Sequence, residues 1–568
     1  MKKTLYIGIA LATLGMLSAC DQSLLDIPQK GVVAIEDYYQ TEADAEAAVV
    51  AVYNQAMTTV STGTSSNHIN APSLFCLTVA LSDDNYWGSN SYNGGAFGRE
   101  INEYRSTFGS NSSTIVNNYS SFYHLVYSAN LLLDHFTYGQ FGAEVDRYIS
   151  EARVWRAYAY LHLATYWGNP PLVTHVLTGA DRPGNTPHDE IMEFIIKELK
   201  EAAPYLPSKS GKNDKKMAVR LTKEAAYAFL GKAQLFAKDY AGAKESLAKV
   251  INSNLYELVP GDQMQYLFHA RGDASPEKII ELNYVDAPGV ISSGNGAYHM
   301  QKSYLMWSRL QYNPDPFIKQ EGWNSGGASP SMKFVEAIMA NEPDSYRRKA
   351  WIVSYEELLT EYPYPTDVPG MTKEEKLMDP KRGLDGKKYN EIYCNCGWFS
   401  IKRAPYQEDL ITNSSADTDE NNAVMRYAEV LLMYAEACAM TGDDGSGLKA
   451  LNEVQARAGA PVTALSMDQV KKERFFELYL EGVRYADLVR WGDAAKELAD
   501  QGKVVPFLKD PFRDGGSEPH QAIIDVTDKK ALINGNDYGF KVGKHELMPY
   551  PYSEIEVNPN IKQNPGWE

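Results

Sequence analysis

The sequence predicts a mostly α-helical protein, in which tetratricopeptide-like helical hairpins form a scaffold and an irregular, loop-rich lobe carries short strands. Two observations predict this fold class. Three stretches place apolar residues at the three- and four-residue spacing of an amphipathic helix, and the second and third each hold two helices. Residues 61–118 and 286–420 are instead rich in Gly, Ser, Asn, Pro and aromatic residues, which is typical of long ordered loops with short strands.

The N-terminus has the pattern of a lipoprotein export signal. Two lysines and an apolar run of about 13 residues precede the sequence Leu17-Ser18-Ala19-Cys20. Such a pattern describes a secretory signal with a cleavage site, and a Cys at the cut describes lipidation of the new N-terminus. The run is shorter than the roughly 20 residues that span a bilayer as a helix. We therefore expect residues 1–19 to be removed and Cys20 to carry lipid; cleavage without lipidation is the alternative.

The first helical stretch runs from Ser150 to Trp167 and stops at a Gly-Asn-Pro-Pro sequence. The other two stretches are hairpins, residues 221–251 with a break at Asp239-Tyr240, and residues 427–458 with a break at 442–445. Each hairpin has a length near the 34 residues of a tetratricopeptide repeat. Because such units bury their faces only by stacking, we expect hairpins that are far apart in the sequence to pack on one another.

Composition narrows the classes of partner. The chain has 55 Lys and Arg residues against 73 Asp and Glu residues, a net charge of -18. Neither a nucleic-acid backbone nor an anionic membrane surface suits this balance, so neutral ligands fit better. The 38 Tyr and 9 Trp residues are typical of surfaces that bind carbohydrate, because an aromatic ring can stack on the apolar face of a sugar. The alternative is that most of these rings belong to the core.

Five blocks of sequence carry a resemblance to a known family. They are RVWRAYAYLHLATYWGNPPLV at 153–173, RLTKEAAYAFLGKAQLF at 220–236, RYAEVLLMYAEACAMTG at 426–442, ERFFELYLEGVRYADLVRW at 473–491 and ELMPYPYSEIEVNPNIKQNPGW at 546–567. In this order, after a lipidation signal, they make the chain resemble the SusD/RagB family of lipid-anchored glycan-binding proteins of the outer membrane. The resemblance implies a tetratricopeptide-like scaffold with an irregular lobe, no catalytic activity, and a SusC-like TonB-dependent transporter for which the protein acts as a lid.

The resemblance also implies a division of the chain into regions and a structural role for four tryptophans. We expect a signal peptide at 1–19, an N-terminal region at 20–255 with the helical scaffold and an early ligand loop, and a C-terminal region at 256–568 with the loop-rich lobe and returning hairpins. Four tryptophans stand in the shared blocks, where we expect them to hold helices together: Trp155, Trp167, Trp491 and Trp567.

One early loop combines the groups that a sugar site needs. Asp83, Asp84, Asn85, Tyr86 and Trp87 follow one another, and rings stack on sugar faces while carboxylate and amide groups bind hydroxyls. The family commonly places sugar-contacting aromatic residues in such loops, which favours Trp87 as a ligand contact. The alternative is that the two carboxylates satisfy turn amides and that Trp87 fills the core beneath.

A second group of rings lies in the loop-rich lobe. Family members typically draw binding rings from this region too, and the candidates here are Tyr298, Tyr304, Trp307, Tyr312 and Trp323. Five rings within 26 residues must include some that pack inward. Which of them contact a ligand is left open by the sequence.

The sequence supports a catalytic site less well than a sugar-binding site. Glu473, Glu477 and Glu481 stand four apart, and oppositely charged residues stand three apart in Glu481–Arg484 and Asp487–Arg490. We interpret them as a structural ion network, because the carboxylates of a glycosidase face each other across a substrate. No metalloprotease, serine-hydrolase or nucleotide-binding motif is present, so we expect no catalytic residue and no cofactor.

The cysteines do not suggest a metal or a disulfide framework. Apart from Cys20, the chain has Cys76, Cys394, Cys396 and Cys438, too few and too scattered for such a framework. The Cys-x-Cys pair lacks the other ligands of a zinc site, so no metal is expected.

The leading hypothesis is a lipoprotein of the outer membrane that faces the cell exterior, binds a neutral oligosaccharide or polysaccharide and passes it to its transporter. It contacts the membrane only through lipid and binds no nucleic acid. Two alternatives stay open: a secreted glycoside hydrolase, suggested by the many carboxylates, and the lid of a peptide-importing transporter, since aromatic grooves bind both classes of ligand.

Overall fold

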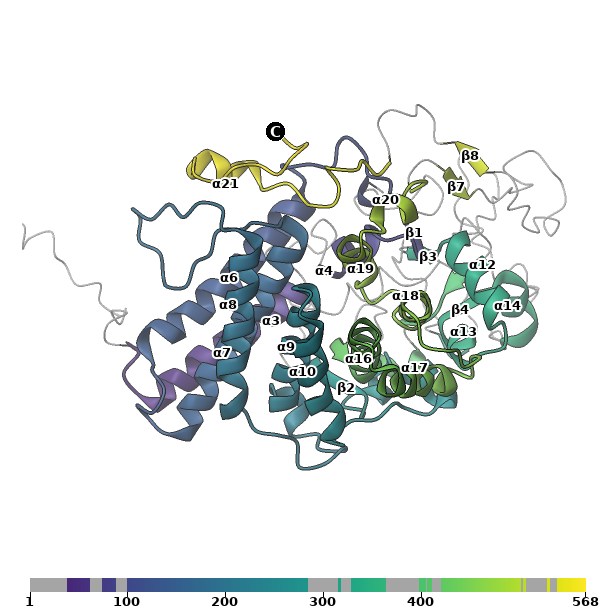
Figure 1. The fold of residues 1–568 in the computed structure, drawn as a ribbon, viewed down its shortest axis with the longest axis horizontal. Coiled ribbons are helices and arrows are strands. Elements are labelled where there is room, and N and C mark those ends of the chain that lie inside the picture. The colour runs from purple at the N-terminus through teal and green to yellow at the C-terminus, as the bar shows by residue number, and fades with distance from the viewer. Residues whose placement is uncertain are drawn as a thin grey trace, which may run out of the picture.

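The computed structural model describes residues 38–61, 74–87, 100–283, 315–317, 328–363, 398–404, 406–410, 420–501, 504–506, 529–531 and 539–568. Figure 1 shows its helices: α3 (Glu42–Ser61), α4 (Leu74–Ala80), α6 (Ser113–His135), α7 (Ala143–Trp167), α8 (His188–Ala202), α9 (Lys223–Phe236), α10 (Tyr240–Asn252), α12 (Met332–Asn341), α13 (Tyr346–Trp351), α14 (Tyr355–Glu361), α16 (Tyr427–Thr441), α17 (Asp444–Ala458), α18 (Met467–Glu477), α19 (Arg484–Trp491), α20 (Ala494–Glu497) and α21 (Tyr552–Val557).

The helical scaffold is a row of neighbouring helices. In order, α3, α6, α7, α8, α9, α10, α16 and α17 each pack against the next (Figure 1). Helices α10 and α16 are adjacent in the row although the whole lobe with α12 to α14 lies between them in the sequence. This contact confirms that the hairpins stack across the chain, and the helical fold class is confirmed with it.

The predicted helices form at the positions expected from the sequence, and nearby residues explain where they begin and end. Thr222 and Asp239 cap α9 and α10, because their side chains accept hydrogen bonds from the third backbone N–H that follows each of them. The two helices cross closely at Gly231, where an added Cβ would lie 2.5 Å from Leu247 Cγ. Helix α16 ends at Gly442, whose φ of 73° is the left-handed conformation that closes many helices.

Two segments predicted as loops contain helices as well. Helix α4 lies inside the stretch 61–118 and α6 begins within it at Ser113, and α12, α13 and α14 lie inside 286–420. The last three have only 10, 6 and 7 residues, too few for an apolar period to stand out. Each nevertheless begins after a serine whose side chain caps the helix, which is the signal that the composition of the segment conceals.

The strands in the described ranges form two-stranded antiparallel sheets, as predicted for the lobe. The strands are β1 (Asn85–Trp87), β2 (Lys278–Leu282), β3 (Ala328–Pro330), β4 (Ile352–Ser354), β5 (Trp398–Ser400), β6 (Asn422–Arg426), β7 (Val504–Pro506) and β8 (Lys529–Ala531). They pair as β1 with β3, β2 with β6, β4 with β5 and β7 with β8. The first two pairs join segments that lie far apart in the sequence.

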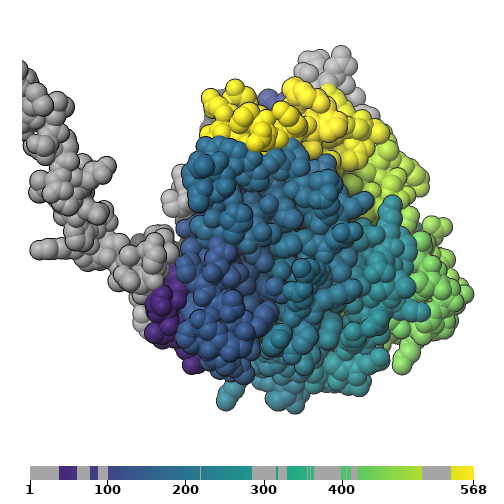
Figure 2. Space-filling model, turned by 60° about the vertical axis from the view of Figure 1, so that its left-hand side comes forward, coloured from purple at the N-terminus to yellow at the C-terminus, as the bar shows by residue number. Residues whose placement is uncertain are grey.

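The C-terminal segment packs on the helical row. Figure 2 shows it, in yellow, along one end of the helical body. The backbone N–H of Met548 donates to the Tyr166 carbonyl at 2.6 Å, and the Trp167 indole donates to the Pro549 carbonyl at 2.9 Å. One buried apolar cluster includes residues from Ala45 to Ile561 and so draws on both predicted regions. The boundary at residue 255 stays a prediction.

The four tryptophans of the shared blocks hold the scaffold together, as expected. Trp155 and Trp167 are fully buried. The indole of Trp491 donates to Glu436 Oε1 at 2.9 Å, and that of Trp567 donates to the Lys544 carbonyl at 3.0 Å. Among the described helices, none is both long and apolar enough to cross a membrane.

Candidate ligand-binding site

Strands β1 and β3 join the early loop that the sequence singled out for ligand binding to a segment of the loop-rich lobe. Asn85 pairs with Pro330, and Trp87 pairs with Ala328 (Figure 1). Trp323 stands five residues before Ala328 in the sequence. The early loop therefore pairs with a strand that follows the second aromatic group in the sequence, although more than 200 residues separate the two strands.

Asp83 anchors β1 from the inside. The side chain is 3% exposed, and its carboxylate accepts hydrogen bonds from Arg484 Nε at 2.8 Å and Nη2 at 3.0 Å and also binds Lys333. Burial raises the pKa of the Asp83 carboxyl, but the charges of Arg484 and Lys333 outweigh it and bring this pKa below its usual value. Lys333 also binds Glu497 Oε2 at 2.5 Å, so α12 and α20 are tied to the same carboxylate.

The next three residues are also directed inward. Asp84 is 2% exposed and accepts hydrogen bonds from Ser82 Oγ at 2.5 Å and Asn85 Nδ2 at 2.7 Å, and burial raises its pKa. The Tyr86 hydroxyl donates to Glu103 Oε1 at 3.3 Å. Asp83, Asp84, Asn85 and Tyr86 thus have protein partners, and these are mainly side chains instead of the turn amides that the alternative interpretation invoked. Their ligand contacts stay a prediction, and the geometry gives them a role in holding β1.

The remaining predicted ligand residues are not placed by the structure. Trp87 belongs to β1 through its backbone, and its side chain lies outside the description. Tyr298, Tyr304, Trp307, Tyr312 and Trp323 lie outside the described residues, as does the predicted lipidation site Cys20. The residues that sequence reasoning missed are Arg484, Lys333 and Glu497. No local pattern connects them with the early loop, and the three-residue spacing had assigned Arg484 to Glu481.

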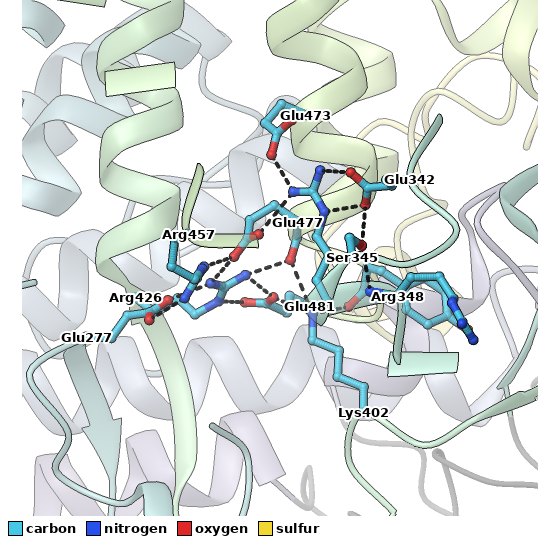
Figure 3. A network of polar contacts seen from close by, with 12 residues as sticks. Glu277, Glu342, Ser345, Arg348, Lys402, Arg426, Arg457, Glu473, Glu477 and Glu481 are labelled. Atoms are coloured by element: carbon cyan, nitrogen blue, oxygen red, sulfur yellow. Dashed lines mark hydrogen bonds and ion pairs between the residues drawn. The ribbon is translucent and has the colours of Figure 1, made fainter. Parts of the chain in front are cut away.

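A buried ion network lies beside this site (Figure 3). Its cations are Arg347, Arg426, Arg457 and Lys402, and its carboxylates are Glu277, Glu342, Glu473, Glu477 and Glu481. Arg426 contacts Glu481 at 2.6 and 2.7 Å, Glu477 at 2.6 Å and Glu277 at 2.7 Å. The predicted ion network is confirmed, and it joins β6, α13, α17 and α18.

One predicted pair in this block is wrong. Glu481 binds Arg426 and Lys402, and Arg484 binds Asp83. The reason is that α18 ends at Glu477, and the chain then turns through Leu480 at φ 54° and Gly482 at φ 74°. Residues on either side of such a turn do not share a helix face. The other predicted pair, Asp487 with Arg490, is confirmed at 2.8 Å.

Glu473 and Glu477 have opposite pKa shifts, which is a property of many acid–base pairs. Burial raises the pKa of Glu473. Burial also acts on Glu477, but the charges of Arg457, Arg426 and Arg347 lower its pKa below the usual value. Both residues are at most 2% exposed and both bind Arg347 from the same helix. This arrangement leaves no space between them for a glycosidic bond and favours a structural role.

No group of three or more His, Cys, Asp and Glu side chains in the described ranges could hold a metal ion. Cys438 is a free, buried cysteine, and burial raises its pKa. Cys394 and Cys396 lie outside the description, and so does the side chain of Cys76.

Comparison with known proteins shows which family models and relatives this chain matches. A model described as "SusD family" matches residues 290–567, and one described as "Starch-binding associating with outer membrane" matches residues 36–235. The SusD-like protein P38 of Formosa agariphila is 22% identical over 545 residues, which covers 88% of this chain and 94% of the relative. The starch-binding protein SusD of Bacteroides thetaiotaomicron is 25% identical over 478 residues, covering 77% and 76%.

Solved structures share the fold. A laminarin-binding SusD-like protein superposes with a TM-score of 0.69 at 24% identity, covering 93% of this chain and all of the other. Surface glycan-binding protein A of Bacteroides thetaiotaomicron, in complex with laminarihexaose, has a TM-score of 0.69 at 20% identity, with 92% and 100% covered. These relatives are described as binding proteins. With two family models matched along its length and this fold, the chain belongs to the SusD/RagB family.

Proposed function

We propose that the protein binds a neutral oligosaccharide or polysaccharide by aromatic stacking and hydroxyl hydrogen bonds, and delivers it to a TonB-dependent transporter of the outer membrane, for which it acts as a lid. The pairing of β1 with β3 carries the proposal, because it joins the early loop with Trp87 to the segment that follows the second aromatic group in the sequence. The names of the relatives, which mention starch, laminarin and surface glycans, support the same class of ligand.

In this proposal the residues of the early loop have two roles. Trp87 and rings from Tyr298, Tyr304, Trp307, Tyr312 and Trp323 contact the sugar. Asp83, through Arg484 and Lys333, holds the backbone of β1 against β3. A preorganised ring costs less conformational entropy when the ligand binds than a ring on a loose loop.

A panel of polysaccharides tests the proposal against its alternatives. The expected result is retention on an affinity gel without release of reducing ends. Release of product would support the glycoside hydrolase. Binding to peptides that free sugars do not displace would support the lid of a peptide importer.

The lipid proposed for Cys20 would anchor the protein to the membrane independently of its folded part. Cys20→Ala should move the protein from the membrane fraction to the soluble fraction without changing its fold, because several acyl chains supply an attachment that a single chain cannot. Fractionation in cells that lack the partner transporter, with circular dichroism of the soluble product, measures both effects. A variant that stays in the membrane would exclude this mode of anchoring.

The transporter partnership predicts a stable complex. A lid must share a large surface with the extracellular loops of a barrel, so mild detergent extraction should recover the protein together with a TonB-dependent transporter. Affinity purification from native membranes and mass spectrometry identify the partner. Recovery as a lone monomer in several mild detergents would contradict the lid role.

A further inference from the structure

A second pocket lies on the helical scaffold, away from β1 and β3. It has a volume of about 340 Å³, and ligand sites commonly have volumes of about 300 to 1,000 Å³. Its walls are helix α6, the segment 171–183 and the end of the chain from α21 onward. Figure 1 shows α6 and α21 in the left half of the view and β1 and β3 to the right of its centre.

One wall of this pocket is a line of tyrosines. Tyr119, Tyr123 and Tyr127 stand four residues apart on α6 and therefore share one face of the helix. Tyr119 is buried at the base, Tyr123 is half-buried, and Tyr127 is 47% exposed at the rim. The exposed apolar side chains of Leu177 and Val557 stand on the other walls. The pocket thus offers an aromatic face that solvent can reach.

Polar groups complement this apolar lining. The Glu554 carboxylate and the His175 imidazole line the pocket, where Glu554 interacts electrostatically with His124 and His175 with Asp181. Burial raises the pKa of Glu554. Asp181 and Arg182 add one charge of each sign at the rim. A purely apolar ligand would cover these groups without giving them partners, which costs free energy. A hydroxylated ligand would supply both donors and acceptors.

The walls of the pocket are fixed before any ligand arrives. Asn130 Nδ2 donates to the carbonyl oxygens of Val173 and His175, both at 3.1 Å, and holds the segment 171–183 on α6. Asn558 Nδ2 donates to the Pro183 carbonyl at 2.7 Å and holds the C-terminal wall on the same segment. Little conformational entropy is therefore lost when a ligand is bound.

We propose that this pocket is a second glycan site, which takes one or two neutral sugar rings through stacking on Tyr127 and hydrogen bonds to Glu554 and His175. The choice of ligand class rests on the proposed function, and the site itself rests on the geometry of the pocket. Two sites on one rigid body would bind a long polysaccharide more tightly than either site alone, because the second contact becomes intramolecular.

Titration calorimetry of the purified chain with laminarihexaose and maltohexaose tests this site. We expect two binding events for the unaltered chain with at least one of these probes. Trp87→Ala should weaken one event by roughly tenfold to a hundredfold and leave the other unchanged. Tyr127→Ala in the same chain should then weaken that other event by at least tenfold. Glu554→Gln should weaken it as well without removing a ring. Tyr205→Ala is the matched control, because Tyr205 has the same 47% exposure elsewhere on the scaffold.

The outcomes separate the two proposals. If Trp87→Ala abolishes all binding, the second site is overturned and the proposed function stands. If Trp87→Ala changes nothing and Tyr127→Ala abolishes binding, the second site stands and the proposed β1–β3 site fails. An equal loss in Tyr205→Ala, or no binding of either probe by the unaltered chain, contradicts the second site.

Discussion

Replacement of Trp87 by alanine is expected to weaken glycan binding by roughly tenfold to a hundredfold while the unfolding transition stays unchanged. Loss of a stacking ring from a small sugar site should cost on the order of 1 to 3 kcal/mol of binding free energy. The partners that hold β1, Asp83 with Arg484 and Lys333, remain in place in this variant. Titration calorimetry gives the affinity, and a thermal melt gives the stability.

The competing interpretation makes the opposite pair of predictions. If Trp87 fills the core, the same substitution should lower the free energy of unfolding by about 3 to 5 kcal/mol. Trp491→Ala is a useful control, because the Trp491 indole binds Glu436 inside the scaffold and its loss should lower stability but not affinity. An unchanged affinity in Trp87→Ala would move the ligand contact to Trp307 and Trp323.

Arg426→Ala is expected to produce the largest loss of stability among single substitutions in the ion network. Arg426 is 1% exposed, and it neutralises Glu277, Glu477 and Glu481 together. Removal of one partner from a buried ion pair leaves charges without compensation and typically costs about 3 to 5 kcal/mol. Urea unfolding followed by tryptophan fluorescence measures the change in the midpoint.

Two further variants make this result specific. Arg426→Lys keeps the charge but loses the planar fork that contacts both oxygens of Glu481, so an intermediate loss is expected. Lys197→Ala removes an exposed ion pair with Glu201 on α8 and should change the free energy of unfolding by less than about 1 kcal/mol. Equal midpoints for Arg426→Ala and the unaltered chain would show that the network contributes no net stability.

Lys402 links the ion network to the turn that follows α18. Burial lowers the pKa of Lys402 to about 7. Its ammonium group contacts Glu481 Oε1 at 2.6 Å, the Tyr479 carbonyl at 2.6 Å and the ring of Trp351, whose centroid is 3.6 Å away. These contacts fix the turn that follows α18. Through that turn, Arg484 reaches Asp83, so the network and the candidate ligand site share one stretch of chain.

The sequence by itself determined the helical scaffold. The apolar spacing of 150–167, 221–251 and 427–458 predicted α7, α9, α10, α16 and α17, and the length of the hairpins predicted that they stack. These inferences succeed because helix formation and the choice of buried face depend on residues within a few turns of one another. The acidic block around Glu477 was predicted as an ion network for the same local reason.

Only the tertiary structure decided which distant groups meet. The pairing of β1 with β3, the contacts of Asp83 with Arg484 and Lys333, and the partners of Glu481 join residues with no shared periodicity. Short strands and ion pairs of this kind are selected by the packing of the elements that carry them, and a turn such as that at Gly482 redirects every residue after it. The residue types of the early loop were therefore enough to predict it as a ligand-binding segment. Only the fold showed that Asp83 is buried in the interior.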